Sequence, residues 1–436
     1  MHDTAALCEA AARRLLEPGL PATAEVQEFL DWIACPVPAD PGPVERDRAL
    51  LLRAAGRFTR LFGLDCPTAP GLAVFGAEVP LDLLAASPGL PLAAASGTGA
   101  SLLEAFFSCL GEGVELLASV ETAADRASLR ADPPHPVDAD WLGQVLPAGA
   151  APEGWAEMRR LDAPGSLWLP ASLCFRSAGS GPPPWPLSIG CAAGPTPEAA
   201  ALHALLELIE RDAAALWWRG GSRGRPVALE DPAAAAAASL LGQLRQGLPP
   251  GGAGRRSWLL DLTTDLAVPV LAALSTDADG RGLCCGIAAR SGRAAAARAA
   301  VLEMAQMETA HAVVLAKRRE GGDAALNARD RAHLARYHGI GADRCALLHP
   351  EGAADPATAL PDDPAAAFAA VTGRLGARGI PVLVRDLTRP ALGVPVLRVL
   401  CPGLAVEPGR FLGARLLACQ AASGGGDCHH GGIGLL

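Results

Sequence analysis

The sequence predicts a mixed α/β (α+β) fold with internally repeated helix and hairpin units. Strand and helix patterns alternate along the chain without the regular strand–helix–strand rhythm of a parallel sheet, so we expect partly antiparallel sheets. Two hairpin segments share one pattern of residues, and three helical segments share another. These repeats indicate a duplication within one large domain.

The composition is that of a folded protein without an extended basic surface. Half of the 436 residues are apolar, 19% are charged, and the formal net charge is −9. The negative charge argues against a nucleic-acid partner, and no apolar run approaches the roughly 18 residues of a membrane-spanning helix. The first residues lack the charged and apolar segments of a secretion signal. We therefore expect a cytoplasmic protein with no nucleic-acid or membrane partner.

Three regions follow one another along the chain. Residues 1–85 hold three segments of helical periodicity between proline-rich breaks, which predicts a helical N-terminal region. Residues 86–410 hold the repeated units and form the main domain. Residues 411–436 are a glycine-rich C-terminal tail, in which Cys428, His429 and His430 form a tight metal-like cluster.

Two segments of the main domain share the letters DLT, a short turn and then VPVL. They span residues 258–276 and 381–403. Apolar strand-forming residues on both sides of a short turn predict a β-hairpin in each segment.

Three helical segments carry polar residues at one spacing, i, i+4 and i+7. The polar positions are Ser108, Glu112 and Glu115 in the first segment, His203, Glu207 and Glu210, followed by Arg211, in the second, and Glu303 and Gln306 at the last two positions of the third. These positions share one face of a helix, where like charges repel unless a cation lies between them. Mg²⁺, which takes carboxylate oxygens and substrate phosphates, is the simplest candidate.

An amphipathic helix can also expose its carboxylates to water, and this reading is open for the first segment taken alone. The third segment is apolar on nearly every side, so Glu303 is expected to be buried. A buried carboxylate must be paired, protonated or bound to a metal. The repeat of the pattern in three helices favours the metal.

The basic residues exclude the common nucleotide-binding loops. All but one of the 37 basic residues are arginine, and the exception, Lys317, ends a helical stretch without a glycine-rich loop. A P-loop requires the pattern G-x4-G-K-[ST], which the chain lacks. A nucleotide would therefore have to bind by another route.

The segment SIGCAAGPTPEAAALHALLELIERDA (residues 188–213) resembles the signature of the YcaO family. The helix after SGTG, the letters EMAQ of the third helix and the hairpin ending in VPVLRVLCPGL match other segments of that family in the same order. The resemblance covers residues 86–410 and implies a YcaO-type fold that binds ATP and Mg²⁺ without a P-loop.

The resemblance also implies roles for the residues of the three helices. The implied metal ligands are Glu112, Glu115, Glu207, Glu210 and Glu303. The residues implied to contact the nucleotide or to orient these ligands are Ser108, His203, Arg211 and Gln306.

The best-known reaction of the family is cyclodehydration of Cys, Ser or Thr in a ribosomally made precursor peptide (RiPP biosynthesis) to a thiazoline or oxazoline. The resemblance implies this ATP-dependent activity, a precursor peptide, an E1-like (ThiF-type) partner protein and, as a further candidate partner, a flavin dehydrogenase. Peptide thioamidation with a TfuA-type partner is an alternative. A non-catalytic scaffold subunit is another, because Thr98 replaces a usual basic residue and the chain ends GGIGLL without a PxPxP tail.

Overall fold

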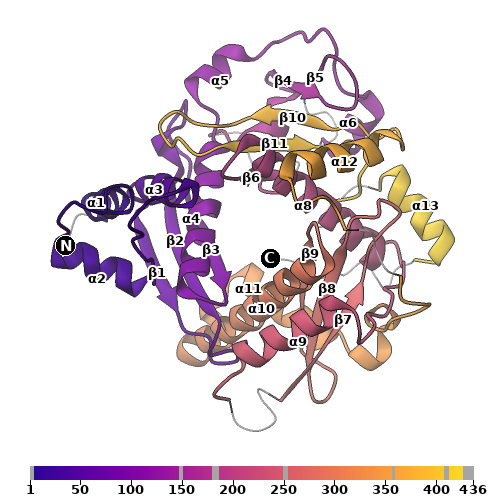
Figure 1. Cartoon of the computed structure of the whole chain (residues 1–436). Helices are drawn as coiled ribbons and strands as arrows, with labels where there is room; N and C mark the ends of the chain where they lie inside the picture. The colour runs from indigo at the N-terminus through magenta and orange to yellow at the C-terminus, as the bar shows by residue number, and fades with distance from the viewer. Residues whose placement is uncertain are drawn as a thin grey trace. The chain divides into compact units, whose positions relative to one another are not determined.

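The computed structural model describes residues 4–146, 151–178, 186–248, 254–355, 359–406 and 412–425. The chain forms two compact units, each with antiparallel strands and covering helices (Figure 1). The first unit comprises Met1–Leu64, Ala73–Leu205 and Leu375–Pro402, and the second comprises Asp65–Leu72, Leu206–Arg374 and Gly403–Leu436. The mixed helix-and-sheet fold is confirmed.

The first unit contains two sheets. One has the strand order β1–β2–β3 and the other the order β5–β4–β10–β11–β6, and all their pairs are antiparallel. The strands are β1 (Arg60–Leu64), β2 (Ala73–Pro80), β3 (Leu92–Gly99), β4 (Trp155–Arg160), β5 (Ser166–Pro170), β6 (Cys191–Ala193), β10 (Leu383–Asp386) and β11 (Val396–Leu400).

Helix α4 covers β2 and β3, and α3 packs against α4 (Figure 1). The Ser101 side chain caps α4 by accepting the Glu104 N–H, and an apolar stripe that includes Phe106, Leu110 and Val114 is fully buried. The helices of this unit are α1 (Thr4–Leu16), α2 (Ala24–Trp32), α3 (Pro43–Ala55), α4 (Leu102–Ala118), α5 (Ala123–Ser128), α6 (Ala139–Val145) and α7 (Ala171–Cys174).

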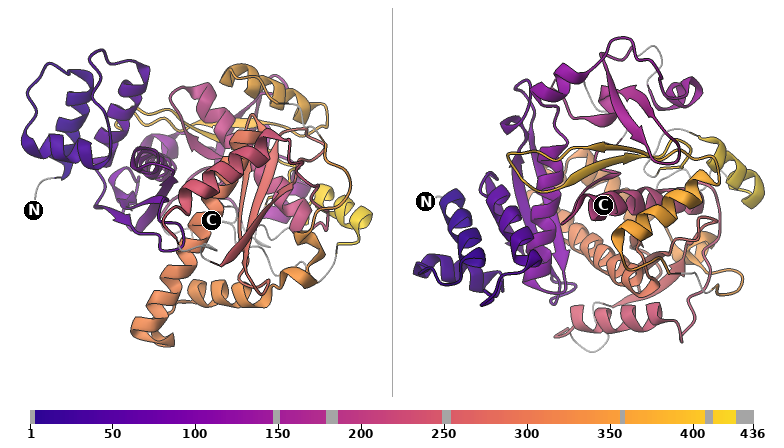
Figure 2. Two further views of the ribbon diagram at one scale, coloured as in Figure 1. Left: turned by 60° about the horizontal axis from the view of Figure 1, so that its bottom comes forward. Right: turned by 45° about the horizontal axis from the view of Figure 1, so that its top comes forward.

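The second unit has one sheet of strand order β7–β8–β9, covered by α10 with α9 beside it. The second half of α10 continues past the sheet to α11 (Figure 2). Its elements are α9 (Pro232–Leu244), β7 (Arg255–Asp261), β8 (Val270–Asp277), β9 (Cys284–Ala289), α10 (Arg293–Gly321), α11 (Ala328–Gly339), α12 (Pro364–Gly376) and α13 (Ala414–Ser423). Helix α8 (Pro197–Trp218) begins in the first unit and ends in the second.

Both predicted hairpins are confirmed, as β7–β8 and β10–β11. Their shared DLT letters make the same side-chain hydrogen bonds at the start of each turn. The N–H groups of Thr263 and Thr388 donate to the carboxylates of Asp261 and Asp386 at 2.8 and 2.7 Å. Each threonine hydroxyl accepts an N–H from the returning strand at 3.2 Å. The repeated letters are thus a repeated turn, in which short polar side chains bond to nearby backbone.

The N-terminal region differs from the prediction. Its α-helices end at Ala55, and β1, β2 and a short 3-10 helix (Leu81–Leu83) follow. Because β2 pairs with β3 along its whole length, from Ala73 opposite Gly99 to Pro80 opposite Leu92, the expected boundary at residue 85 falls inside a sheet. A strand needs a hydrogen-bonded neighbour, so these strands cannot be separated from the main domain.

The expected C-terminal tail is only partly described. Within residues 411–436, the structure shows α13, and the Cys428–His430 cluster lies outside the described residues. Among the described helices, none combines the length and the apolar character needed to cross a membrane.

Candidate functional site

In two places a strand leads into a helix whose carboxylate bonds back to the strand. The Ser96 N–H of β3 donates to Glu112 Oε2 of α4 at 2.7 Å, and the Ile287 N–H of β9 donates to Glu303 Oε2 of α10 at 2.7 Å. Donor and acceptor are 16 residues apart in both. The predicted duplication is therefore visible at the atoms that hold these glutamates.

A second pair of hydrogen bonds joins α4 to β6, the strand before α8, and α8 to β9, the strand before α10. The Ala193 N–H of β6 donates to Glu115 Oε1 at 2.8 Å, and the Ala289 N–H of β9 donates to Glu210 Oε2 at 3.2 Å. The sequence separations, 78 and 79 residues, are almost equal. Four of the five predicted metal-ligand glutamates are thus oriented by a backbone N–H.

The strands approach these helices closely enough to require glycine. A Cβ atom at Gly97 of β3 would lie 2.1 Å from the Cys109 nitrogen of α4, and one at Gly286 of β9 would lie 2.2 Å from the Ala300 oxygen of α10. Real Cβ atoms do not come so near to backbone atoms. The glycines let the strand N–H groups reach the carboxylates.

Arg211 lies within ion-pair distance of two carboxylates of α8. Its Nη2 atom is 3.5 Å from Glu210 Oε1 and 4.0 Å from Glu207 Oε1. Arg211 and Glu210 are buried, and Glu207 is half-buried. The predicted ligands of α8 and Arg211, which is implied to contact the nucleotide or to orient those ligands, therefore form one group on one face of the helix.

Burial and neighbouring charge disfavour the ionised glutamates. Burial raises the pKa of Glu303 to about 8, and the carboxylate of Glu210 adds to the effect while Arg211 opposes it. Burial also raises the pKa of Glu210, against the charges of Arg211 and Arg290, and it raises the pKa of Glu112 despite the hydrogen bonds from Ser96. A bound cation would stabilise the ionised form of each.

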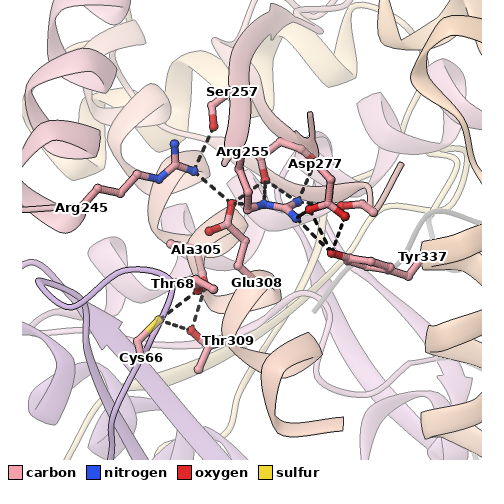
Figure 3. A network of polar contacts seen from close by, with 12 residues as sticks. Cys66, Thr68, Arg245, Arg255, Ser257, Asp277, Ala305, Glu308, Thr309 and Tyr337 are labelled. Atoms are coloured by element: carbon pink, nitrogen blue, oxygen red, sulfur yellow. Dashed lines mark hydrogen bonds and ion pairs between the residues drawn. The ribbon is translucent and has the colours of Figure 1, made fainter. Parts of the chain in front are cut away.

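Another glutamate of α10, Glu308, differs from Glu303 in having direct cationic partners. Its Oε1 atom accepts from Arg245 at 3.1 Å and from Arg255 at 3.0 Å (Figure 3). The same atom accepts from the Ser275 hydroxyl at 2.5 Å. Within the described structure, Glu303 has the one hydrogen bond from Ile287 and no ion pair. Protein cations in direct contact therefore neutralise Glu308, whereas Glu303 has no such ion pair among the described residues and retains the capacity to bind a cation.

A cavity of about 630 Å³ lies in the first unit next to the polar face of α4. Ser108, Glu112, Glu115 and His203 are among its lining residues, so the structure brings these four predicted residues to one cavity. Ser108 and His203 are exposed, whereas the two glutamates are half-buried. The polar face therefore borders a space that a ligand can enter.

The donor set fits Mg²⁺ in its chemistry, since carboxylate oxygens are the side-chain ligands that this ion prefers. In the described ranges, no three side chains of His, Cys, Asp or Glu are grouped closely enough to hold a metal alone. Mg²⁺ usually keeps waters and shares substrate phosphates instead of occupying an all-protein site. Pairs of carboxylates, as in Glu112 with Glu115, suit that mode. Gln306 is half-buried on α10, three residues after Glu303.

Sequence reasoning missed two parts of this region. The backbone donors of β3, β6 and β9 have no sequence signal, because every residue except proline carries an N–H. The cavity wall supplied by α3, which includes Arg48, Leu50 and Leu51, lay in the region predicted to be a separate helical segment. The amphipathic pattern of α3 showed an apolar face but not what that face would border.

Comparison with known proteins identifies the family. Residues 96–405 match the model of the family described as YcaO cyclodehydratase, ATP- and Mg²⁺-binding. The chain belongs to the YcaO family. The predicted family is confirmed, and so are ATP and Mg²⁺ as the cofactors of that family. No curated protein matches the chain.

Solved structures share the YcaO fold. A heterocyclase in complex with substrate and cofactor has 24% identity and a TM-score of 0.64, with 88% of this chain and 55% of that chain covered. YcaO from Methanopyrus kandleri bound with AMPPCP and Mg²⁺ has 20% identity and a TM-score of 0.57, with 87% and 91% covered. The E. coli microcin synthetase McbBCD complex with pro-MccB17 bound has 13% identity and a TM-score of 0.52, with 79% and 87% covered. The chain thus spans about half the length of the first of these proteins.

Proposed function

We propose that this YcaO protein uses Mg²⁺ and ATP to modify backbone amides of a ribosomally made precursor peptide, by cyclodehydration of Cys, Ser or Thr to an azoline. The observation that carries the proposal is the cavity of the first unit, whose lining includes Ser108, Glu112, Glu115 and His203. In the proposal Glu112, Glu115, Glu207, Glu210 and Glu303 are the Mg²⁺ ligands. Ser108, His203, Arg211 and Gln306 contact the nucleotide or orient those ligands.

The lining of the cavity offers both polar and apolar groups to a nucleotide. Glu112 and Glu115 supply carboxylates to the lining, and Leu51, Leu103 and Phe107 supply apolar wall. Along α4, the 12 residue steps from Leu103 to Glu115 span about 18 Å at 1.5 Å per step, so the cavity lining extends over several helical turns. We place the phosphates and Mg²⁺ at the carboxylates and the adenine base against the apolar wall.

Phe107 provides a test of this placement. Replacing Phe107 by alanine removes an aromatic face from the cavity and is expected to weaken ATP binding about 3- to 10-fold, the usual worth of one aromatic contact. The measurement is titration of the protein with a fluorescent ATP analogue in excess Mg²⁺. Leu102→Ala is the matched control, since Leu102 is exposed on the same helix and does not line the cavity. Equal affinity in wild type and Phe107→Ala would place the base elsewhere.

The chemistry requires activation of a poor leaving group. The side-chain thiol or hydroxyl attacks the carbon of the preceding amide, and ATP supplies a phosphoryl group that turns the amide oxygen into phosphate, a good leaving group. The nitrogen keeps its bond to the ring carbon, and the products are azoline, ADP and phosphate. The role of the protein is to hold the phosphates with Arg211 and with metal-bound glutamates while charge develops on them.

Peptide mass distinguishes the proposed reaction from its rivals. Purified protein is incubated with ATP, Mg²⁺ and a precursor peptide, with and without an E1-like (ThiF-type) partner, which we propose recruits the peptide. A flavin dehydrogenase, the further candidate partner, is left out so that the azoline persists. Cyclodehydration is expected to remove one water mass per ring and to consume ATP.

Two other outcomes would overturn the proposal. Replacement of oxygen by sulfur, in the presence of a sulfur donor and a TfuA-type partner, would show thioamidation. An unchanged peptide mass with every partner present, together with Mg²⁺-dependent ATP binding, would show a non-catalytic scaffold.

A further inference from the structure

One arginine binds each of the three helices that carry the predicted glutamate ligands. It binds at a point on the helix away from those glutamates. The arginines are Arg389 for α4, Arg415 for α8 and Arg293 for α10, and their side chains are 10, 17 and 10% exposed. None of the three is among the residues expected to contact nucleotide or metal. All three bind more than one group of the protein at once.

Arg389 binds the C-terminal end of α4. Its Nε and Nη2 atoms donate to the Ala118 carbonyl at 2.9 and 2.7 Å, and Nη2 also donates to the Val120 carbonyl at 2.7 Å. Its Nη1 atom is 2.8 Å from Asp125. Carbonyl groups at the end of a helix lack partners within the helix and carry its partial negative charge, so a cation there stabilises the helix end. Glu115 lies three residues before Ala118.

Arg415 of α13 binds α8 from the side away from its acidic face. Asp212, one residue after Arg211, is fully buried. Its two carboxylate oxygens accept from Arg415 Nε at 2.9 and 3.0 Å, and Oδ1 also accepts the Ala405 N–H at 2.9 Å. Arg415 also donates to Asp265 in the turn between β7 and β8, at 3.3 Å from Nη1. One guanidinium thus joins α13, α8 and that turn.

Arg293 is the first residue of α10. Its Nε atom donates at 2.7 Å to Asp231, the N-cap of α9, and its Nη1 atom donates at 2.8 Å to Asp261, the last residue of β7. Asp261 is buried. The helix that carries Glu303 is therefore fixed at its start to both a neighbouring helix and the sheet.

We infer that Arg293, Arg389 and Arg415 are positioning residues that set the three helices so that their glutamates bind Mg²⁺ and ATP, an inference that rests on the proposed function. A guanidinium has a rigid planar fork that binds two or three acceptors at fixed angles, which a lysine ammonium does not reproduce. This requirement gives a physical reason for arginine at these three positions in a chain with a single lysine.

The test replaces each arginine by lysine, which keeps the charge and removes the fork. The exposed Arg319 near the end of α10, replaced by lysine, is the control. Affinity for a fluorescent ATP analogue is measured over a series of Mg²⁺ concentrations, and thermal unfolding is followed by circular dichroism. We expect the three variants to bind about 10- to 100-fold more weakly, as for residues that orient metal ligands, with affinity regained as Mg²⁺ is raised.

Arginines that serve only the stability of the fold would give another result. The variants would then melt at lower temperature and bind the analogue as wild type does, which would overturn the inference. Wild-type protein that fails to bind the analogue at any Mg²⁺ concentration would overturn the proposed function, and this inference with it. The three helices are tested independently, so a variant that does not fold leaves the other two to decide. Asp265→Asn provides a milder test of Arg415, because it removes only the half-exposed partner of that arginine.

Discussion

Replacing Glu207 by glutamine is expected to abolish Mg²⁺-dependent ATP consumption and to leave the fold intact. Glu207 is half-buried on the acidic face of α8, one helical turn before Arg211. Glutamine keeps the shape of the side chain but cannot neutralise a cation. Loss of one charged metal ligand is expected to remove about 3 kcal/mol or more of transition-state stabilisation. We therefore expect kcat/KM for ATP to fall by about 100-fold or more. The measurement is ADP release in the presence of peptide and varied Mg²⁺.

Glu198→Gln is the matched control, because Glu198 is an exposed glutamate in the first turn of the same helix. It removes the same charge from the same element and is expected to act as wild type. Circular dichroism of both variants establishes that the helices are retained. Full activity in Glu207→Gln would remove Glu207 from the proposed metal ligands.

Replacing Gly286 by alanine is expected to destabilise the second unit and weaken Mg²⁺–ATP binding together. The new Cβ would lie 2.2 Å from the Ala300 oxygen and 2.3 Å from the Met304 nitrogen, both backbone atoms of α10. To avoid this clash, β9 and α10 must separate, which loosens the core and lengthens the hydrogen bond between Ile287 and Glu303. We expect the free energy of unfolding to fall by about 3 kcal/mol or more, at the upper end of overpacking effects. Urea unfolding provides the measurement.

The control for this change is Gly242→Ala in α9. No atom lies within 4 Å of a Cβ built at Gly242, so the same substitution meets open space there. Alanine favours a helix by about 0.5–1 kcal/mol over glycine, and a small gain in stability is expected. If Gly286→Ala unfolds at the same urea concentration as wild type, the close approach of β9 to α10 does not occur in solution.

The sequence allowed the local elements to be predicted better than their partners. The helix of Glu112, the helix of Glu207 and the two DLT hairpins were predictable because their signals lie within one continuous segment. Strands β1 and β2 were missed, since β2 depends on pairing with β3 for its hydrogen bonds. Short apolar strands have no helix-like periodicity of their own, so their place follows from tertiary contacts.

The candidate site was predictable to the level of side-chain type. Regular spacing placed Ser108, Glu112 and Glu115 on one face, and the structure shows them lining one cavity. The order of burial was not predictable: Glu303, expected to be buried, is half-buried, whereas Glu210 is buried. Burial depends on which elements pack over a face, and periodicity reports only the face itself.

The hydrogen bonds from strand backbone to helix carboxylates bear on how this family can diverge. The four donor positions hold serine, alanine, isoleucine and alanine, at residues 96, 193, 287 and 289. Because the donor is the main-chain N–H, a mutation at any of them preserves the bond unless it introduces proline. Any substitution that the surrounding packing accepts can therefore change these strand residues while the carboxylates stay oriented. The acidic side chains, which have no such substitute, are where selection must act.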